Sequence, residues 1–169
     1  QTNHRVRRVD RVTGIMTTVA GTGVAGYGGD GGPATAALLD AVRNICFDPK
    51  GNLYIVDAGN HRVRKVDTAG IIITVAGNGI PGYSDYVYNG GRADTSRLGD
   101  PWGVCSDDTG NIYICNGNWV FKLNTTGYLH VIGGTGIPGY SGDGGPATAA
   151  QVANESIARD RYGNLFLTQ

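Results

Sequence analysis

The chain has 169 residues, which is enough for one domain with a hydrophobic core. Its 14 basic residues balance its 14 acidic ones, and no basic run suggests binding to nucleic acid or to an anionic membrane. No segment approaches the ~18 consecutive apolar residues of a membrane span. The chain starts without a methionine or a signal peptide, so we expect a processed chain or a piece of a longer one.

Short β-rich runs recur along the chain at an offset of 57 residues, so that residues 60–67 (NHRVRKVD) repeat residues 3–10 (NHRVRRVD). Such runs, bounded by Gly, Asn and Asp, are typical of antiparallel strands. The 29 glycines recur at fixed places in the repeat, which indicates turns and not a disordered tract. The expected strands are residues 3–10, 15–20, 44–48, 53–57, 61–67, 71–76, 103–107, 112–116, 120–124, 128–133, 156–160 and 165–168.

Four short antiparallel strands in each period predict β-propeller blades, because so small a sheet must bury its faces against neighbouring sheets. We therefore predict an all-β fold with two whole blades, residues 44–76 and 103–133. Two half blades, residues 1–20 and 156–169, are expected at the termini. Glycine-rich loops join these parts into a single domain, residues 1–169.

The order of residues in each period resembles the NHL repeat. Residues 51–67 (GNLYIVDAGNHRVRKVD) carry the resemblance, with an Asn-His turn at residues 60–61. Residues 3–4 repeat this turn, whereas residues 117–119 depart from it with Gly-Asn-Trp. The resemblance covers nearly the whole chain and implies a β-propeller, usually with six blades. It implies no single activity, because most members are binding scaffolds and some relatives are lactonases or lyases.

The two half blades continue into each other in register. Residues 164–169 followed by residues 1–6 match residues 52–63 without a gap. Unpaired strand edges are templates for pairing with another chain, so we expect head-to-tail self-association. The expected interface residues are Asn3, His4, Arg5, Val6, Arg7, Val9, Leu165, Phe166 and Leu167.

Three blades are too few for an ordinary ring, which needs at least ~4. Two chains could close a six-bladed ring, or many chains could form an open filament. The segment could also belong to a longer tandem chain, and a trimmed fragment with arbitrary boundaries remains the alternative to all three.

No group of residues indicates a cofactor or a catalytic centre. Three Gly-x-Gly-x-x-Gly runs lack the helix that a dinucleotide site needs, so we interpret them as turns. Asp30 and Asp143 lie in a repeated Gly-Asp-Gly-Gly-Pro loop, where Ca²⁺ binding is the alternative to an Asx turn, which we favour. His4 and His61 share one repeated turn position, and His130 has no ligand cluster nearby in sequence. We predict no cofactor and no enzymatic activity.

The cysteines and the N-glycosylation sequons give information on whether the protein is extracellular. Cys105 and Cys115 lie on consecutive strands of one predicted hairpin, where a disulfide and two buried thiols are both open. Asn124 and Asn154 begin N-glycosylation sequons, and Asn124 is expected at an exposed turn. Together with a loop, GYSGDGGPAT, that looks like the one in many secreted NHL proteins, they favour an extracellular or cell-surface protein with N-linked glycans.

Several aromatic residues fall at repeated positions, among them Tyr27 and Tyr140 in the glycine-rich loops, and are expected to pack between blades. Carbohydrate stacking is the alternative for these loop tyrosines. Non-repeated aromatics are better candidates for a partner surface, because packing alone would have kept the copies alike. These residues are Tyr86, Tyr88, Trp102 and Trp119.

We therefore predict a non-enzymatic extracellular structural protein whose split blade is completed by a neighbouring chain or repeat, as a fibre or a closed ring. Two alternatives stay open. One is a ligand-binding sensor module that forms half of a six-bladed propeller. The other is a lactonase- or lyase-like propeller enzyme, which would need metal ligands converging on a central channel.

Overall fold

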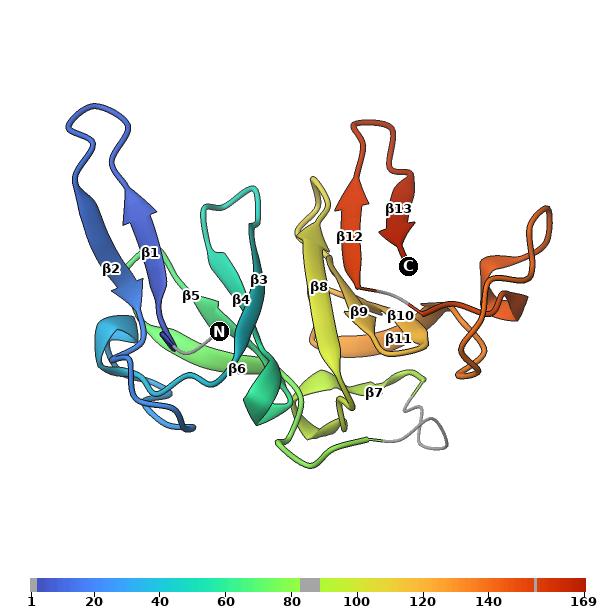
Figure 1. The fold of residues 1–169 in the computed structure, drawn as a ribbon, viewed down its shortest axis with the longest axis horizontal. Coiled ribbons are helices and arrows are strands. Elements are labelled where there is room, and N and C mark those ends of the chain that lie inside the picture. Colours follow the sequence, from blue (N-terminus) through green and yellow to red (C-terminus); the bar gives the residue numbers. More distant parts are fainter. Residues whose placement is uncertain (1–2, 83–88, 154) are drawn as a thin grey trace.

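The structure, a computed structural model, describes residues 3–82, 89–153 and 155–169. Its strands form four antiparallel sheets that follow one another along the molecule (Figure 1). The two outer sheets have two strands each: β1 (Val6–Val9) with β2 (Met16–Ala20), and β12 (Ser156–Arg159) with β13 (Leu165–Thr168). One inner sheet has the order β3 (Val42–Phe47), β4 (Leu53–Asp57), β5 (Arg62–Val66), β6 (Ile72–Ala76). The other has the order β7 (Gly91–Arg92), β11 (Tyr128–Gly133), β10 (Trp119–Leu123), β9 (Ile112–Asn116), β8 (Pro101–Ser106).

The predicted all-β fold of small antiparallel sheets is confirmed, and the helices among the described residues are all single turns of 3-10 helix. These turns are Ala34–Ala36, Ala58–Asn60, Ala93–Thr95 and Ala147–Ala149. Two strands begin earlier than expected, at Val42 and Pro101, because each pairs across a bulge with the end of the next strand. Strand β7 was not expected; it belongs to a glycine-rich loop that pairs with β11.

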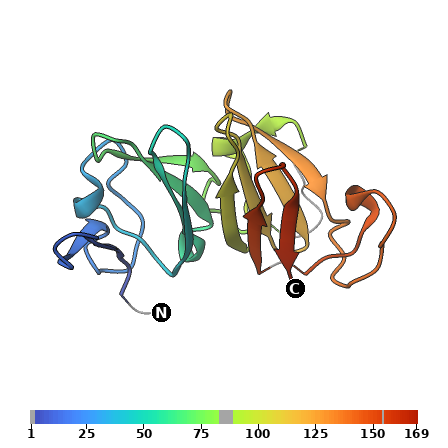
Figure 2. The ribbon, with the colours of Figure 1, turned by 90° about the horizontal axis from the view of Figure 1, so that it is seen from above.

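The sheets pack face to face, with the strands β3, β8 and β12 side by side (Figures 1 and 2). The largest core cluster lies between the two inner sheets and includes Tyr54 and Val56 from one sheet and Val104, Ile112 and Ile114 from the other. The two-stranded sheets lie at opposite ends of this row, so each has one face without a neighbouring sheet (Figure 1).

An aspartate closes each of the hairpin turns β3–β4, β8–β9 and β12–β13. The carboxylate of Asp107 accepts hydrogen bonds from the backbone N–H groups of Thr109 and Asn111, and the Asn111 amide donates to its other oxygen at 2.7 Å. Asp48 and Asp160 make the same contacts in their own turns. Burial opposes ionisation of Asp107, but these hydrogen bonds outweigh it and hold its pKa well below its usual range.

The Asn-His turn depends on a left-handed backbone. His4 and His61 have φ of 41° and 52°, and the His61 ring contacts the Gly99 carbonyl at 2.7 Å. In the third copy, strands β9 and β10 are joined through Gly117 and Asn118 alone, and Gly117 has φ of 56°. The departure from the motif seen in the sequence is therefore a shorter turn, in which glycine takes the conformation that histidine takes elsewhere.

Candidate functional site

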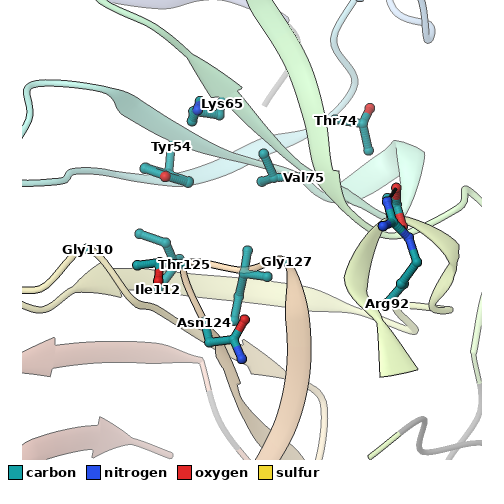
Figure 3. A pocket seen from close by; sticks show the side chains of 12 residues that line it. Tyr54, Lys65, Thr74, Val75, Arg92, Gly110, Ile112, Asn124, Thr125 and Gly127 are labelled. Atoms are coloured by element: carbon teal, nitrogen blue, oxygen red, sulfur yellow. Dashed lines mark hydrogen bonds and ion pairs between the residues drawn. The ribbon is translucent and has the colours of Figure 1, made fainter. Parts of the chain in front are cut away.

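Two hollows lie between successive sheets, one repeat apart. The first, the inter-sheet pocket, has a volume of about 230 Å³ and lies between the two inner sheets. Figure 3 shows Tyr54, Lys65 and Val75 on one side of it and Ile112 and Asn124 on the other. Its volume is below the ~300 Å³ at which ligand sites usually begin.

The second hollow, the open groove, has a volume of about 560 Å³ and lies between the β1–β2 sheet and the β3–β6 sheet. Most of its lining residues are the counterparts, one repeat earlier, of those of the inter-sheet pocket. Leu53 stands for Ile112, for example, and Val19 for Val75. The lining residues are Val6, Arg7, Arg8, Val19, Ile45, Phe47, Gly51, Leu53, Val66, Asp67, Thr68 and Gly70.

One aromatic side chain distinguishes the two hollows. Tyr54, on the second strand of its sheet, is only 7% exposed and lines the inter-sheet pocket. The β1–β2 sheet lacks the two strands that would carry its counterpart, and the open groove is more than twice as large. In the last sheet the residue at the Tyr54 position is Phe166, which is 58% exposed. The open groove thus lacks an aromatic side chain at the Tyr54 position, and the residue at that position in the last sheet, Phe166, is exposed.

The strands β3, β8 and β12 also differ in how far each is covered by the sheet before it. Ile45, Val104 and Ile157 hold one position on β3, β8 and β12. Val104 and Ile157 are 2% and 6% exposed because a preceding inner strand covers each of them. Ile45 has no such strand before it and is 41% exposed, next to Phe47 at 62%. Ile45 and Phe47 thus form an apolar face on β3 that no strand covers in the single chain.

A buried ion pair attaches the first glycine-rich loop to the β3–β6 sheet. The Arg64 guanidinium is fully buried and lies 2.6 Å from Asp30 and 3.2 Å from Asp57. Asp30 also accepts hydrogen bonds from the Thr74 backbone N–H and hydroxyl and from the Tyr27 hydroxyl. The Asx turn expected at Asp30 is therefore wrong. The guanidinium also takes the place that a bound cation would need at this carboxylate.

The loop tyrosine adds a second attachment. The Tyr27 ring lies 3.7 Å from the guanidinium carbon of Arg62, which also donates to the Asn78 carbonyl at 2.7 Å. Arg5, the counterpart of Arg62, makes the equivalent contact with the Thr22 carbonyl. Tyr140, the counterpart of Tyr27, is 91% exposed. The two loops therefore differ in environment although their sequences nearly agree.

All three cysteines are free thiols, so the disulfide considered between Cys105 and Cys115 is wrong. The strand register pairs Cys105 with Tyr113 and Cys115 with Gly103, which places the two sulfurs on residues that are not opposite each other. Burial raises the pKa of the Cys115 thiol to about 12, so it is a protonated packing group at neutral pH.

The sequon at Asn124 lies in a tighter setting than expected. Asn124 is half-buried, and its side-chain oxygen accepts hydrogen bonds from the backbone N–H groups of Thr126 and Tyr128 at 3.1 and 2.9 Å. Its amide nitrogen lies 3.4 Å from His130. The expectation of a freely exposed Asn124 is therefore wrong, because the side chain closes its own turn. Asn154 lies outside the described residues.

The predicted partner surface is only partly described, since Tyr86 and Tyr88 lie outside the described residues. Trp102 stacks on Arg43 at 3.5 Å and donates its indole N–H to Asp100 at 2.7 Å, and Arg43 pairs with Asp100. Trp119 takes the position of Arg62. Its side chain packs against the largest core cluster, and its ring lies next to Gly136.

Within residues 3–82, 89–153 and 155–169, no three His, Cys, Asp or Glu side chains come together as metal ligands. In the same part of the chain, no helix has the length and apolar character needed to cross a bilayer.

Comparisons with known proteins find the NHL repeat in this chain. The family model described as "Teneurin NHL domain" matches residues 3–80. Chicken (Gallus gallus) teneurin-1 is 31% identical over 131 residues, which cover 72% of this chain and 5% of that protein. The Arabidopsis thaliana chloroplastic protein SUPPRESSOR OF QUENCHING 1 is 31% identical over 105 residues, 60% of this chain and 10% of that protein. The chain thus spans a tenth or less of either relative.

Solved structures share the fold at low identity. An auxiliary nutrient binding protein from Bacteroides ovatus superposes with a TM-score of 0.69 and 19% identity, over 98% of this chain and 40% of that one. A virginiamycin B lyase from Staphylococcus aureus gives 0.54 and 12%, over 98% and 42%. These likenesses concern the fold alone. The family model, the likeness to teneurin-1 and the repeated Asn-His turns identify the chain as an NHL-repeat protein, and the solved structures share its β-propeller fold.

Proposed function

We propose that this chain is a non-enzymatic, extracellular structural segment that assembles by completing its split blade with β12–β13 of a second copy. One observation carries the proposal. The open groove lacks the aromatic side chain that fills the equivalent inter-sheet pocket, and Phe166, its repeat counterpart, is exposed at the opposite end. A second copy that places β13 beside β1 brings Phe166 into this groove.

The strand register supports the same joint. In the complete sheet, Leu53 pairs with Val66 and Ile55 with Arg64. Transferred by the repeat, this register pairs Leu165 of one copy with Val9 of the other, and Leu167 with Arg7. Val9 is 59% exposed although its counterpart Val66 is 7% exposed. Strand addition of this kind combines backbone hydrogen bonds with burial of alternate side chains.

An extracellular location is part of the proposal. It is supported by the likeness to teneurin-1 and by the sequon at Asn124. A non-enzymatic role is supported by the match to the teneurin NHL model and by the fold shared with an auxiliary nutrient binding protein, although lyases and a putative gluconolactonase also have this fold.

The test is the native mass of the chain measured by light scattering across a concentration series. Wild-type chain is expected to associate, and Phe166→Asp and Phe47→Asp are each expected to weaken association at least tenfold, because a charge would enter an apolar joint. Tyr162→Asp is the matched control, since Tyr162 is 74% exposed on the β12–β13 hairpin away from the joint. A wild-type chain that stays single at all concentrations would overturn the proposal.

A further inference from the structure

The inter-sheet pocket lies entirely between the two inner sheets. Its lining residues come from β4, β5 and β6 on one side (Figure 3). On the other side they come from β7, β9, β10 and the turns next to these strands. Each of the two sheets has a neighbouring sheet on its other face, so the pocket is an internal feature of the row of sheets (Figure 1).

One part of the pocket wall is apolar. Val75 contributes from the first sheet, and Ile112 and Leu123 contribute from the second. Tyr54 also lines the pocket and is 7% exposed, and its hydroxyl donates to Asp48 of its own sheet at 3.4 Å. Because this hydroxyl already has a partner, Tyr54 contributes mainly ring surface to the pocket.

The charged part of the wall is not balanced. Arg92 and Asp94 pair with each other through two hydrogen bonds, at 3.0 and 2.5 Å. No hydrogen bond or ion pair joins the ammonium group of Lys65, which also lines the pocket, to another described residue. A lysine in this setting lays its stem along apolar surface and leaves its charged head to water. An anionic ligand can replace that water.

The repeat shows how this lysine comes to stand without a carboxylate. In the open groove, one repeat earlier, Arg8 takes the position of Lys65 and Asp67 lines the same hollow. The inter-sheet pocket has Asn124 at the Asp67 position. Both side chains accept the same two backbone hydrogen bonds in their turns, so the turn does not require the exchange. What the exchange changes is the charge, because it removes one carboxylate and keeps the cation.

The volume of the pocket sets the size of a ligand. A dry apolar cavity of roughly 150 Å³ holds one benzene molecule. The inter-sheet pocket has about 230 Å³, which leaves room for a carboxylate beside such a ring. Drug-sized ligands, which occupy ~300–1,000 Å³, are too large for it.

We propose that the inter-sheet pocket binds a small monocarboxylate that carries one flat apolar ring. The carboxylate pairs with the Lys65 ammonium, and the ring lies against Val75 and Ile112. This inference does not rest on the proposed assembly, because every lining residue belongs to the inner sheets and their turns. It gives the chain a second property, the recognition of a small anion, which a purely structural segment does not need.

Benzoate and benzamide are the probes, because they share one shape and differ in charge. Each is titrated into the full chain, and the methyl signals of valine and isoleucine are followed by NMR. Benzoate is expected to bind with a dissociation constant of about one millimolar and to shift the signals of Val75 and Ile112. Benzamide is expected to bind at least roughly tenfold more weakly, because it cannot form the ion pair.

Two variants test the charge from either side. Lys65→Met removes the cation, and Asn124→Asp restores the carboxylate that the repeat carries at Asp67, with its turn hydrogen bonds intact. Each is expected to weaken benzoate binding at least roughly tenfold while the circular dichroism spectrum stays that of wild type. Lys122→Met is the matched control, because Lys122 holds the Lys65 position on β10, lies over Tyr113 at 5.8 Å and does not line the pocket. It is expected to bind benzoate like wild type.

The location and the charge dependence each decide the inference. Shifts at Val19 in the open groove in place of Val75 and Ile112 would overturn it. So would equal affinity for the two probes, benzoate binding that survives Lys65→Met, or no saturable binding at concentrations roughly tenfold above the expected constant. None of these outcomes bears on the split-blade assembly, which the native mass tests separately.

Discussion

At the scale of single residues, the buried guanidinium of Arg64 needs hydrogen-bond partners from several parts of the fold. Arg64 is fully buried and satisfied by Asp30, Asp57 and the carbonyls of Gly28 and Leu38. Burying a charge is costly unless every group around it is paired. The arginine therefore specifies where the loop sits, because only the docked loop brings Asp30 and the two carbonyls to it.

Removal of this side chain is expected to be strongly destabilising. Arg64→Met leaves Asp57 as a buried carboxylate without its cation, and such losses cost about 3–5 kcal/mol. Urea unfolding followed by circular dichroism measures the change. Arg11→Met, at an exposed turn position, is the control and is expected to change stability by less than ~0.5 kcal/mol. An Arg64 variant as stable as the control would show that the ion pair makes no net contribution.

The turn aspartates predict how stability responds to acid. The pKa of Asp107 is lowered in the folded chain, where hydrogen bonds from Asn111 and Thr109 outweigh the opposing effect of burial. Its contribution is therefore fully present above the unfolded value of about 3.9 and is lost as the pH falls toward the lower folded value. We expect Asp107→Asn to flatten the fall in unfolding free energy below pH ~4 relative to wild type. An acid slope equal to that of wild type would contradict this assignment.

At the scale of elements, strands and hairpins followed closely from the sequence. The repeat spacing predicted β4, β9, β11 and β13 with their observed bounds, because Gly-Asn and Asn-His turns mark both ends of short β-branched and aromatic runs. The sequence did not predict β7 or the docking of Asp30 on Arg64. Both depend on contacts between a loop and the following sheet, 34 residues apart for Asp30 and Arg64, that no local pattern encodes.

For the candidate site, the repeat register alone named Phe166, Arg7 and Val9 as interface residues, and their part in a joint stays a prediction. The expectation of an exposed Asn124 was wrong, and of the two alternatives for Cys105 and Cys115 the structure has the free thiols. Both outcomes depend on side-chain contacts and on which residues face each other across a hairpin.

The two loops provide an internal comparison of one sequence in two environments. In the single chain, the amide protons of Gly31 and Ala34 are bonded to β6 and the turn before it, while those of Gly144 and Ala147 have no backbone acceptor among the described residues. We expect hydrogen exchange to be at least roughly tenfold slower at the first pair than at the second. The measurement uses Phe166→Asp to keep the chain single. Loops that exchange alike in the single chain would contradict the docking of the first loop on β6.

At the scale of the whole molecule, the proposed joint brings two different surfaces of the chain together, the open groove and the β12–β13 sheet. Such a heterologous joint closes a ring if the rotation per copy divides a full turn, and otherwise continues as a filament. The described strands form a four-stranded and a five-stranded sheet with a two-stranded sheet at each end, and the count predicted from the sequence is three blades per copy. Because the NHL resemblance implies rings that usually have six blades, two copies supply the number needed for closure.

We therefore expect a closed particle of two chains. Two chains of 17.6 kDa give about 35 kDa, and closure leaves no free β1 or β13 edge, so the mass should stop rising with concentration at this value. Light scattering across the series gives the mass, and electron microscopy gives the shape. A mass that keeps increasing, with fibres in the images, would retain the split blade as the joint but assign it a rotation that does not close. Particles of about 35 kDa that dissociate when Phe166→Asp is introduced, and persist when Tyr162→Asp is introduced, would place the joint at the open groove.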